Sequence, residues 1–390
     1  MKILFLSAWY PHRYDPMPGL FVKQHAEAVT GDNDVAVLYV HPCNVDAVEV
    51  DKRIIHNVFT AIIYYPAVRS RFPGVEILKA FRFLKAHWLG YKLVRKDFGK
   101  PHLIHVNILT RCGVVALFAR MFYSIPYVIT EHWSRYLPSR NEYRGALRKM
   151  LTRLVIRQSE GLVTVSEALK TAMMDCGLNH KRFQVIHNSV DTSLFVPASG
   201  MKNSEKIIFT HVSCFDDAAK NISGILRAVK LLGETRNDFE LHLVGDGPDR
   251  IKVEELSNSL ELTGKFVFFR GLLEGQELVN AYQNSCFMVL FSNYENMPVV
   301  VAESFACGIP VIATSVGGLP EIVNASNGVL VRLGDESTLV QELNNMLGNF
   351  RQYNSATIRH FAEQKFSTDV FRKAYYEFYY STQKLNKQGL

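Results

Sequence analysis

The sequence predicts an α/β protein of two doubly wound, Rossmann-like domains, each a parallel sheet between layers of helices. Short apolar runs of strand length alternate with helical stretches from one end of the chain to the other. Runs that are apolar throughout indicate strands covered on both faces, as in parallel sheets. The alternation pauses at a polar, turn-rich stretch near 190–205 and then restarts. The 390 residues, 48% of them hydrophobic, supply enough apolar material for two cores.

The first domain is predicted to span 1–195. Its apolar runs lie at 3–7, 35–40, 59–65, 103–106, 127–130, 162–165 and 184–186. Helical stretches such as 20–29, 75–96 and 113–122 separate most of them. The first run is too short for the apolar region of a signal peptide, because polar residues follow at once. We therefore expect a buried first strand and a cytoplasmic protein.

The second domain is predicted to span 196–367, with apolar runs at 207–212, 241–244, 266–269, 287–291, 311–313 and 329–331. A helix dense in aromatic residues follows at 368–390, after residues with N-cap chemistry. We expect this helix to cross back to the N-terminal domain. Two facing domains of this kind direct the carboxyl ends of their strands toward a shared cleft that can hold two substrates.

Composition excludes several classes of protein. The apolar content argues against disorder as the main state, and no apolar run approaches the roughly 20 residues that span a bilayer. The six cysteines form no CxxC pair, which argues against a structural zinc site and is typical of a reducing compartment. Residues 1–195 carry 26 Lys+Arg against 15 Asp+Glu, a net +11, and residues 196–390 carry 18 against 22, a net −4. This asymmetry suggests domains with different partners.

The most informative segment is 292–311, which follows the apolar run 287–291. Pro298 suits the first turn of a helix, where its missing N–H costs nothing. The amides of Val299 and Val300 would then be unpaired donors at a helix N-terminus. Such donors can hold a phosphate without any charged side chain.

Two carboxylates bracket this helix start. Glu295 lies in the loop before the helix and Glu303 lies within it. Both can face a cleft and accept hydrogen bonds from sugar hydroxyls. For the pair alone, two solvated helix charges are the alternative interpretation.

The segment resembles the E-x7-E motif of retaining glycosyltransferases of family 4, which have the GT-B fold. Three more segments resemble motifs of that family and occur in the family's order along the chain. Residues 186–191 resemble its Asn-Gly-Val-Asp hinge entry, 243–248 its Gly-Asp-Gly-Pro turn and 314–323 its Gly-Gly-x-x-Glu turn. The resemblance covers nearly the whole chain.

The resemblance implies a nucleotide-sugar donor site in the second domain. Glu303 would bind the ribose hydroxyls and Glu295 the hydroxyls of the transferred sugar. Lys220 matches the family's phosphate-binding lysine, and would stabilise the leaving diphosphate as negative charge builds there. An exposed lysine at a helix start is the alternative. The implied donor site also includes Arg270, whose backbone would face the base, together with Asn296, Met297, Pro298, Val299 and Val300.

In the first domain, residues 18–23 resemble the family's glycine turn, where Gly19 would let the backbone approach the diphosphate. His132 follows the run 127–130, where the family has a histidine near the reacting sugar. The resemblance therefore makes His132 a catalytic candidate beside Glu295 and Lys220, with a structural histidine as the alternative. His105 is predicted to be structural.

One departure from the family concerns the diphosphate. The family has Gly-Arg-Leu shortly before the lysine, whereas residues 211–215 contain no arginine. Either another cation substitutes or a phosphate contact is lost. The implied mechanism is front-face attack with retention of configuration. Neither a metal nor another cofactor is expected, because no Asp-x-Asp motif is present and GT-B enzymes generally need no metal.

The stretch 69–100 carries nine Lys+Arg against two Asp+Glu, with interleaved aromatic residues. It can lie on an anionic membrane surface, at the inner face of a membrane and near a lipid-linked acceptor. An ordinary helix with a solvated outer face is the equal alternative. Nucleic acid is not expected as a partner, because no recognition motif accompanies the charge.

The resemblance therefore implies a retaining glycosyltransferase that uses a UDP- or GDP-sugar and a glycan or lipid-linked acceptor, in cell-surface polysaccharide biosynthesis. Two alternatives stay open. A non-catalytic nucleotide-sugar-binding partner is suggested by the missing arginine, and a sugar-nucleotide epimerase would share the architecture. A dinucleotide-dependent dehydrogenase is excluded, because no G-x-G-x-x-G follows the first strand.

Overall fold

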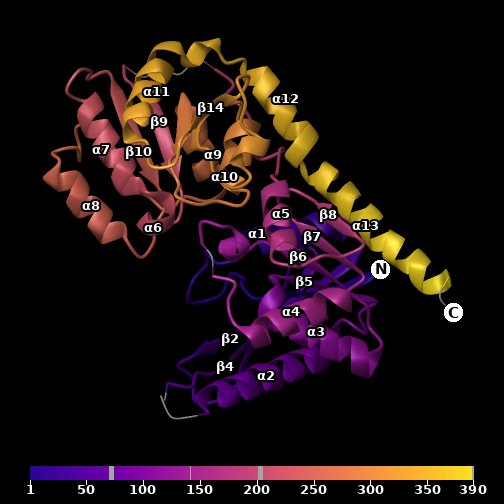
Figure 1. Cartoon of the computed structure of the whole chain (residues 1–390). Helices are drawn as coiled ribbons and strands as arrows, with labels where there is room; N and C mark the ends of the chain where they lie inside the picture. The colour runs from indigo at the N-terminus through magenta and orange to yellow at the C-terminus, as the bar shows by residue number, and fades with distance from the viewer. Residues whose placement is uncertain (70–73, 141, 201–204, 389–390) are drawn as a thin grey trace. The chain divides into compact units, whose positions relative to one another are not determined.

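The computed structural model describes residues 1–69, 74–140, 142–200 and 205–388 (Figure 1). Contacts divide the chain into two compact units. The first contains Met1–Val165, Lys170–Ile186 and Phe371–Leu390, and the second contains Ser166–Leu169 and His187–Val370. Each unit is an α/β domain built on one sheet.

The first unit has an eight-stranded sheet with the order β3-β4-β2-β1-β5-β6-β7-β8. The strands are β1 (Lys2–Ser7), β2 (Asp34–Cys43), β3 (Glu49–Ile55), β4 (Val58–Pro66), β5 (Leu103–Asn107), β6 (Tyr127–Glu131), β7 (Gly161–Thr164) and β8 (Phe183–Val185). All neighbours pair in parallel except β3, which is antiparallel to β4. The apolar runs did not predict β3, because most of its residues are exposed and polar at the sheet edge.

Helices cover this sheet. They are α1 (Leu20–Ala28), α2 (Val75–Asp97), α3 (Leu109–Tyr123), α4 (Ala146–Arg157) and α5 (Glu167–Asp175), with short turns η1 (Val29–Gly31) and η2 (Ser134–Tyr136). The central strand β1 is buried along almost its whole length. An alternation of parallel strands and helices of this kind places ligand loops at the carboxyl ends of the strands.

The last helix, α13 (Thr368–Gln388), returns to the first unit, as the sequence predicts (Figure 1, yellow). Its buried aromatic side chains join the core of that unit. The hydroxyl of Tyr375 lies 2.8 Å from Thr130 Oγ1, and that of Tyr379 lies 2.7 Å from His105 Nδ1. His105 Nε2 also lies 2.7 Å from Thr130 Oγ1, so His105 is a structural residue with both nitrogens engaged.

The second unit has a six-stranded parallel sheet with the order β11-β10-β9-β12-β13-β14. The strands are β9 (Ile207–Val212), β10 (Phe239–Val244), β11 (Val267–Gly271), β12 (Phe287–Leu290), β13 (Val311–Thr314) and β14 (Gly328–Val331). The helices are α6 (Asp217–Lys220), α7 (Ile222–Leu232), α8 (Arg250–Ser259), α9 (Gly275–Asn284), α10 (Val299–Ala306), α11 (Glu336–Asn349) and α12 (Ser355–Phe366), with turns η3 (Leu319–Glu321) and η4 (Phe350–Gln352). Each of these strands matches an apolar run of the sequence.

The boundary between the units differs from the predicted one at 195/196. The second unit begins at His187, because the following residues bond to it rather than to the first sheet. Asn188 Nδ2 donates to the carbonyl of Met297 at 2.7 Å, and Arg359 Nη1 donates to the carbonyl of Phe195 at 2.8 Å. The described part of the turn-rich stretch, up to Gly200, therefore lies inside the second unit.

Candidate functional site

The candidate site lies where the strand order of the second sheet reverses, between β9 and β12. The loops after these two strands lead away in opposite directions, and in open α/β sheets this is where ligands bind. Lys220 follows β9 at the end of α6, and Glu295 follows β12. The fold thus brings together two residues that are 75 positions apart in the sequence.

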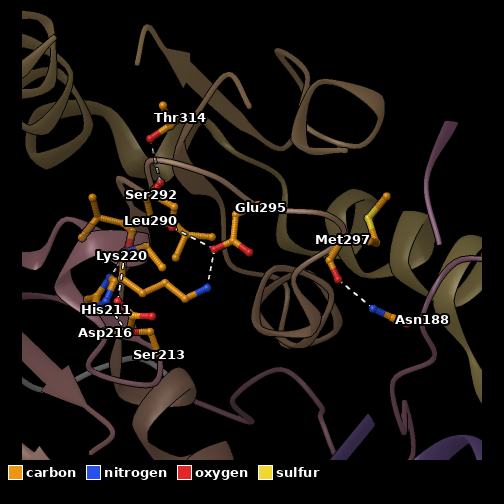
Figure 2. Close-up of polar contacts among 12 residues, drawn as sticks. Asn188, His211, Ser213, Asp216, Lys220, Leu290, Ser292, Glu295, Met297 and Thr314 are labelled. Atoms are coloured by element: carbon orange, nitrogen blue, oxygen red, sulfur yellow. Dashed lines mark hydrogen bonds and ion pairs between the residues drawn. The ribbon is translucent and has the colours of Figure 1, made fainter. Parts of the chain in front are cut away.

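Lys220 and Glu295 form a direct ion pair (Figure 2). Lys220 Nζ donates to Glu295 Oε1 at 2.5 Å, and Ser292 Oγ donates to the same oxygen at 2.8 Å. The two side chains are only 16% and 8% exposed. Burial lowers the pKa of Lys220, but the charge and hydrogen bond of Glu295, together with smaller contributions from Cys214 and Tyr294, raise the pKa on balance. The lysine is therefore a charged group held in one place.

The local sequence fixes this lysine. The Asp216 side chain caps α6 by accepting from the amide of Ala219 at 3.2 Å. Asn221 then adopts a left-handed backbone with φ of 48°, which ends α6 and lets its side chain cap α7. Because α6 is a single turn between two caps, the backbone position of Lys220 is fixed, and the bond to Glu295 sets the direction of its side chain.

The loop that carries Glu295 rests on a glycine pair. A Cβ atom at Gly317 would lie 1.8 Å from the carbonyl oxygen of Glu295, and one at Gly318 would lie 2.4 Å from that of Asn296. The amide of Gly318 donates to the carbonyl of Asn296 at 2.7 Å. The Gly-Gly turn of the sequence is thus explained by this close approach of two backbones.

The start of α10 differs from the sequence prediction by one position. Pro298 is the N-cap, with extended backbone, and Val299 is the first helical residue. Within the described part of the chain, the amides of Val299 and Val300 donate to no other residue. Buried Met297 precedes them and is held through its carbonyl by Asn188. The helix start therefore presents two amides, as predicted.

Glu303 is buried in the same helix. Its Oε2 accepts a hydrogen bond from Tyr282 Oη of α9 at 2.9 Å. Burial raises the pKa of Glu303 to about 7, which the bond from Tyr282 opposes. The acid is thus poised to be neutral or charged near neutral pH. Its partner is a phenol, whereas the partner of Glu295 is the ammonium group of Lys220.

The missing arginine has no replacement in His211, the first residue of the stretch 211–215. Its Nδ1 lies 3.0 Å from the carbonyl of Val289 and its Nε2 lies 2.7 Å from Ser213 Oγ. Burial lowers the pKa of His211 to about 4, so the ring is neutral at physiological pH. Lys220 is therefore the cation that this loop supplies.

Arg270 lies at the end of β11, on the same edge of the sheet. Its side chain is exposed and its Nη2 donates to His242 Nε2 at 3.0 Å. The side chain is thus turned to a neighbouring strand, and a role toward a base would fall to the backbone of Arg270.

Gly19 and His132 belong to the first unit. Gly19 precedes α1 with a φ of 71°, and a Cβ there would lie 2.2 Å from the carbonyl oxygen of Trp9, so the loop itself requires glycine. His132 is buried directly after β6, with its Nε2 3.3 Å from Asn107 Oδ1 and its ring 4.5 Å from that of Phe21. Burial lowers the pKa of His132 well below its usual value, so the ring is neutral.

Sequence reasoning missed two partners of the predicted acids. Ser292 binds Glu295, and Tyr282 binds Glu303. Ser292 stood inside the motif, three residues before its acid, which is a usable signal. Tyr282 had no such signal, because a lone aromatic residue on an amphipathic helix reads as core.

Two structural tests concern metals and membranes. Among the described residues, no three His, Cys, Asp or Glu side chains are grouped as a metal site. No described helix is both long enough and apolar enough to cross a bilayer.

Family models cover most of the chain. Residues 195–358 match the model described as Glycosyl transferases group 1, and residues 28–194 match Glycosyltransferase Family 4. Among relatives, the chain is 26% identical over 251 residues to N-acetyl-alpha-D-glucosaminyl L-malate synthase of Bacillus anthracis, covering 61% of this chain and 64% of that protein. It is 26% identical over 358 residues to a glycosyltransferase of Methanocaldococcus jannaschii, covering 90% and 89%.

Solved structures agree on the architecture. Sucrose-phosphate synthase from Thermosynechococcus elongatus matches with a TM-score of 0.79 at 20% identity, over 99% of this chain and 100% of that one. The Anabaena protein HepE, in complex with UDP and glucose, matches with a TM-score of 0.75 at 18% identity, over 98% and 100%. The catalytic domain of starch synthase IV from Arabidopsis thaliana, bound to ADP and acarbose, matches with a TM-score of 0.71 at 14% identity, over 98% and 99%.

Proposed function

The chain belongs to the family 4 glycosyltransferases and has the GT-B fold, and from this premise we propose that it retains configuration while moving a sugar from a UDP- or GDP-sugar to a glycan or lipid-linked acceptor. The setting we propose is cell-surface polysaccharide biosynthesis. The observation that carries the proposal is the buried pair of Lys220 and Glu295 beside the free amides of α10.

The pair gives a physical account of leaving-group departure. When the bond to the sugar breaks, negative charge grows on the diphosphate. Lys220 is already charged, oriented and stripped of most water, so it stabilises that charge without reorganising. The amides of Val299 and Val300 add the partial positive charge of a helix N-terminus. We propose that these groups replace a metal ion in the transfer.

Glu295 is proposed to bind the hydroxyls of the transferred sugar. Its carboxylate is paired with Lys220 and accepts from Ser292, and both interactions reduce its power as a nucleophile. This favours attack by the acceptor on the same face over a covalent glycosyl-enzyme. Glu303, with Oε1 not bonded to any described residue, is proposed to accept from the ribose hydroxyls.

His132 and Gly19 have weaker support. The neutral, enclosed ring of His132 can accept or donate one hydrogen bond near the sugar but cannot supply a charge. Gly19 is proposed to present its backbone to the diphosphate, although the loop around Trp9 already requires glycine there. Arg270 is proposed to contact the base through its main chain.

A membrane role is supported by α2, while residues 70–73 of the basic stretch lie outside the described part. Four apolar side chains of α2 are exposed at helical spacing, namely Ile77, Phe81, Leu84 and Trp88. A solvated outer face would carry polar residues at these positions, so the stripe favours the membrane over the alternative. Exposed lysines flank it, and we propose that α2 docks on an anionic bilayer, which would place a cytoplasmic enzyme on the inner face of the membrane.

The membrane proposal is tested with vesicles. Phe81→Ser with Trp88→Ser should reduce co-sedimentation with anionic vesicles, and Lys85→Glu with Lys96→Glu should reduce it further at low salt. Arg82 is a poor choice, because its Nη1 donates to the carbonyl of Pro66 at 2.9 Å. Lys181→Glu, at another exposed position of the first unit, is the control. A wild-type protein that never sediments with anionic vesicles would contradict the proposal.

The donor proposal is tested by thermal shift against UDP, GDP, ADP, CDP and dTDP, free and sugar-linked. Ligands that bind only the folded state raise its melting temperature by mass action. We expect stabilisation by UDP or GDP that Glu303→Ala removes and that the exposed control Glu277→Gln keeps. Stabilisation by none of the five would contradict the donor site.

The alternatives give different results with the matching sugar nucleotide. A transferase releases the nucleoside diphosphate only when an acceptor, including water, takes the sugar. An epimerase interconverts two sugar nucleotides without releasing it. A non-catalytic partner is stabilised by the ligand and returns it unchanged.

A further inference from the structure

A second candidate site lies wholly within the first unit. A cavity of about 630 Å³ opens there at the carboxyl edge of the sheet. Its walls come from the ends of β1, β2 and β4, from the segment after β6, and from α2, α3 and α4. This volume is in the range of small-molecule sites, and the position is where α/β sheets bind ligands.

The charge in this cavity has one sign. The charged side chains that line it are Arg111, Arg135 and Arg148, and no Asp or Glu is among its described lining residues. Arg111 and Arg148 are exposed at the rim, while Arg135 is 6% exposed. A cavity lined by cations alone concentrates anions.

Arg135 is the unusual member. Its Nε and Nη1 are buried and have no hydrogen-bond partner among the described residues. Its guanidinium carbon lies 3.1 Å from the ring centre of Trp133, which holds the group in place but satisfies none of its N–H donors. Leaving such donors unmade in the interior costs free energy, so their retention points to a ligand that accepts from them.

The two carboxylates whose charges act on Arg135, Glu131 and Glu142, are bonded to other groups. Glu131 Oε1 accepts from the amides of His132 at 2.8 Å and Trp133 at 2.9 Å, and its Oε2 accepts from Tyr136 Oη at 3.3 Å. Glu142 pairs with Arg140 at 2.6 Å. Neither carboxylate is bonded to Arg135, so both guanidinium donors remain available to an oxyanion.

The rest of the cavity suits a ring. Trp9 and Trp133 lie with ring centres 5.1 Å apart, and Tyr39, Tyr65 and Phe83 extend the aromatic wall. Aromatic faces pack on the apolar face of a sugar, and a planar guanidinium matches a carboxylate or phosphate with two parallel hydrogen bonds.

We propose that this cavity binds the acceptor, and that the acceptor carries an oxyanion that bonds to Arg135 while a sugar ring packs on Trp9 and Trp133. Arg111 and Arg148 attract and screen that anion at the rim. That the ligand is the acceptor rests on the proposed transferase function. That the cavity binds an anion does not depend on that function. The oxyanion can belong to a soluble sugar phosphate or sugar acid, or to the phosphate of a lipid-linked acceptor.

Calorimetric titration with no donor present tests the site. The probes are glucose, glucose 6-phosphate, glucuronate and inorganic phosphate. We expect the charged sugars to bind at least roughly tenfold more tightly than glucose or phosphate alone, because charge-assisted bonds and ring packing add. Arg135→Met should lower the binding affinity for the charged sugars roughly ten- to hundredfold. The exposed Arg157→Gln on the same helix as Arg148 is the control.

A second variant protects the test against misfolding. Arg148→Gln, at an exposed position, should lower the binding affinity for the charged sugars a few-fold and reduce the salt dependence of binding. Polyprenyl phosphate in phosphatidylcholine vesicles then competes with glucose 6-phosphate, which tells a lipid source from a soluble one.

The proposal is overturned if glucose binds as tightly as glucose 6-phosphate, if Arg135→Met binds like the wild type, or if neither the soluble probes nor the vesicles bind. Loss of nucleotide binding in the second unit, with anion binding intact, would instead refute the transferase function and leave this site standing.

Discussion

The two units place a cation at the same edge of similar sheets but treat it in opposite ways. In the second unit, Lys220 is paired with Glu295, and the pair is held by Ser292. In the first unit, Nε and Nη1 of buried Arg135 have no hydrogen-bond partner among the described residues, and the guanidinium stacks on the ring of Trp133. A paired cation helps to hold its own fold together, whereas an unpaired one destabilises the fold until an anion arrives. The second site is thus complete in itself and the first is built for a charged partner.

Removing the paired cation should have the largest effect. Lys220→Met leaves the buried carboxylate of Glu295 without its partner, so the free energy of unfolding should fall by about 3 kcal/mol in urea titration. Nucleotide release should fall by roughly 10²–10³-fold, because the leaving charge loses its stabiliser.

Two variants check the cause of that loss. Lys220→Met with Glu295→Gln should regain most of the stability but none of the turnover. Lys252→Met, at an exposed lysine of α8, should change neither. Equal stability of Lys220→Met and wild type would show that the pair does not hold the loop.

The second test concerns Glu303, the buried acid of the proposed donor site that has no cation bonded to it among the described residues. Glu303 has a phenol instead of a cation beside it, and its pKa is raised from 4.5 to about 7. Between these values the folded state binds more protons than the unfolded state, so this group makes stability fall as pH rises from 4.5 to 7. The full effect above pH 7 is about 3 kcal/mol before relaxation.

Glu303→Gln should therefore be more stable than the wild type at pH 8 and equal to it near pH 4.5. Urea titrations at the two pH values measure this, with exposed Glu277→Gln as the control. A constant difference across the range would mean that Glu303 does not titrate in this window.

Removing the unpaired cation should change stability least, and in the opposite direction. Arg135→Met removes an unpaired buried cation and keeps its length, so the free energy of unfolding should rise by about 1 kcal/mol without ligand. Lys220→Met moves in the opposite direction. If Arg135→Met is instead destabilised at every concentration of glucose 6-phosphate, the stacked guanidinium is a structural group.

Much of this could be predicted from sequence, for identifiable reasons. Strands buried on both faces are apolar throughout, so every strand of the second sheet stood out, while β3 did not because its residues face solvent. The spacing of Glu295 and Glu303 placed both acids around a helix start, but the position of Pro298 was wrong by one residue. Helix caps depend on backbone angles that a sequence leaves open by a residue or two.

Other features lay beyond such reasoning. The predicted boundary at 195/196 follows the turn-rich stretch, whereas contacts divide the chain at His187, because Asn188 and Phe195 bond to residues of the second unit. Arg135 lacks a bonded carboxylate because Glu131 and Glu142 form their hydrogen bonds and ion pair with other groups. No local sequence pattern predicts this. A sequence motif can predict groups of functional residues that lie close together in the chain. A single residue such as Arg135 is recognised only from its surroundings in the structure.

The return of α13 to the first unit has a consequence for synthesis. Thr130 and Tyr375, which meet in that core, are separated by 245 residues. At roughly 5–20 residues per second, a ribosome needs about 10–50 s to reach the second partner after making the first. Most of the first unit is therefore synthesised early, but its core is completed only when α13 emerges. The second unit, whose residues lie between these two parts of the chain, can finish folding before the first. The nascent protein must keep an open hydrophobic groove soluble for that interval, and a chain cut short before Phe371 never closes it.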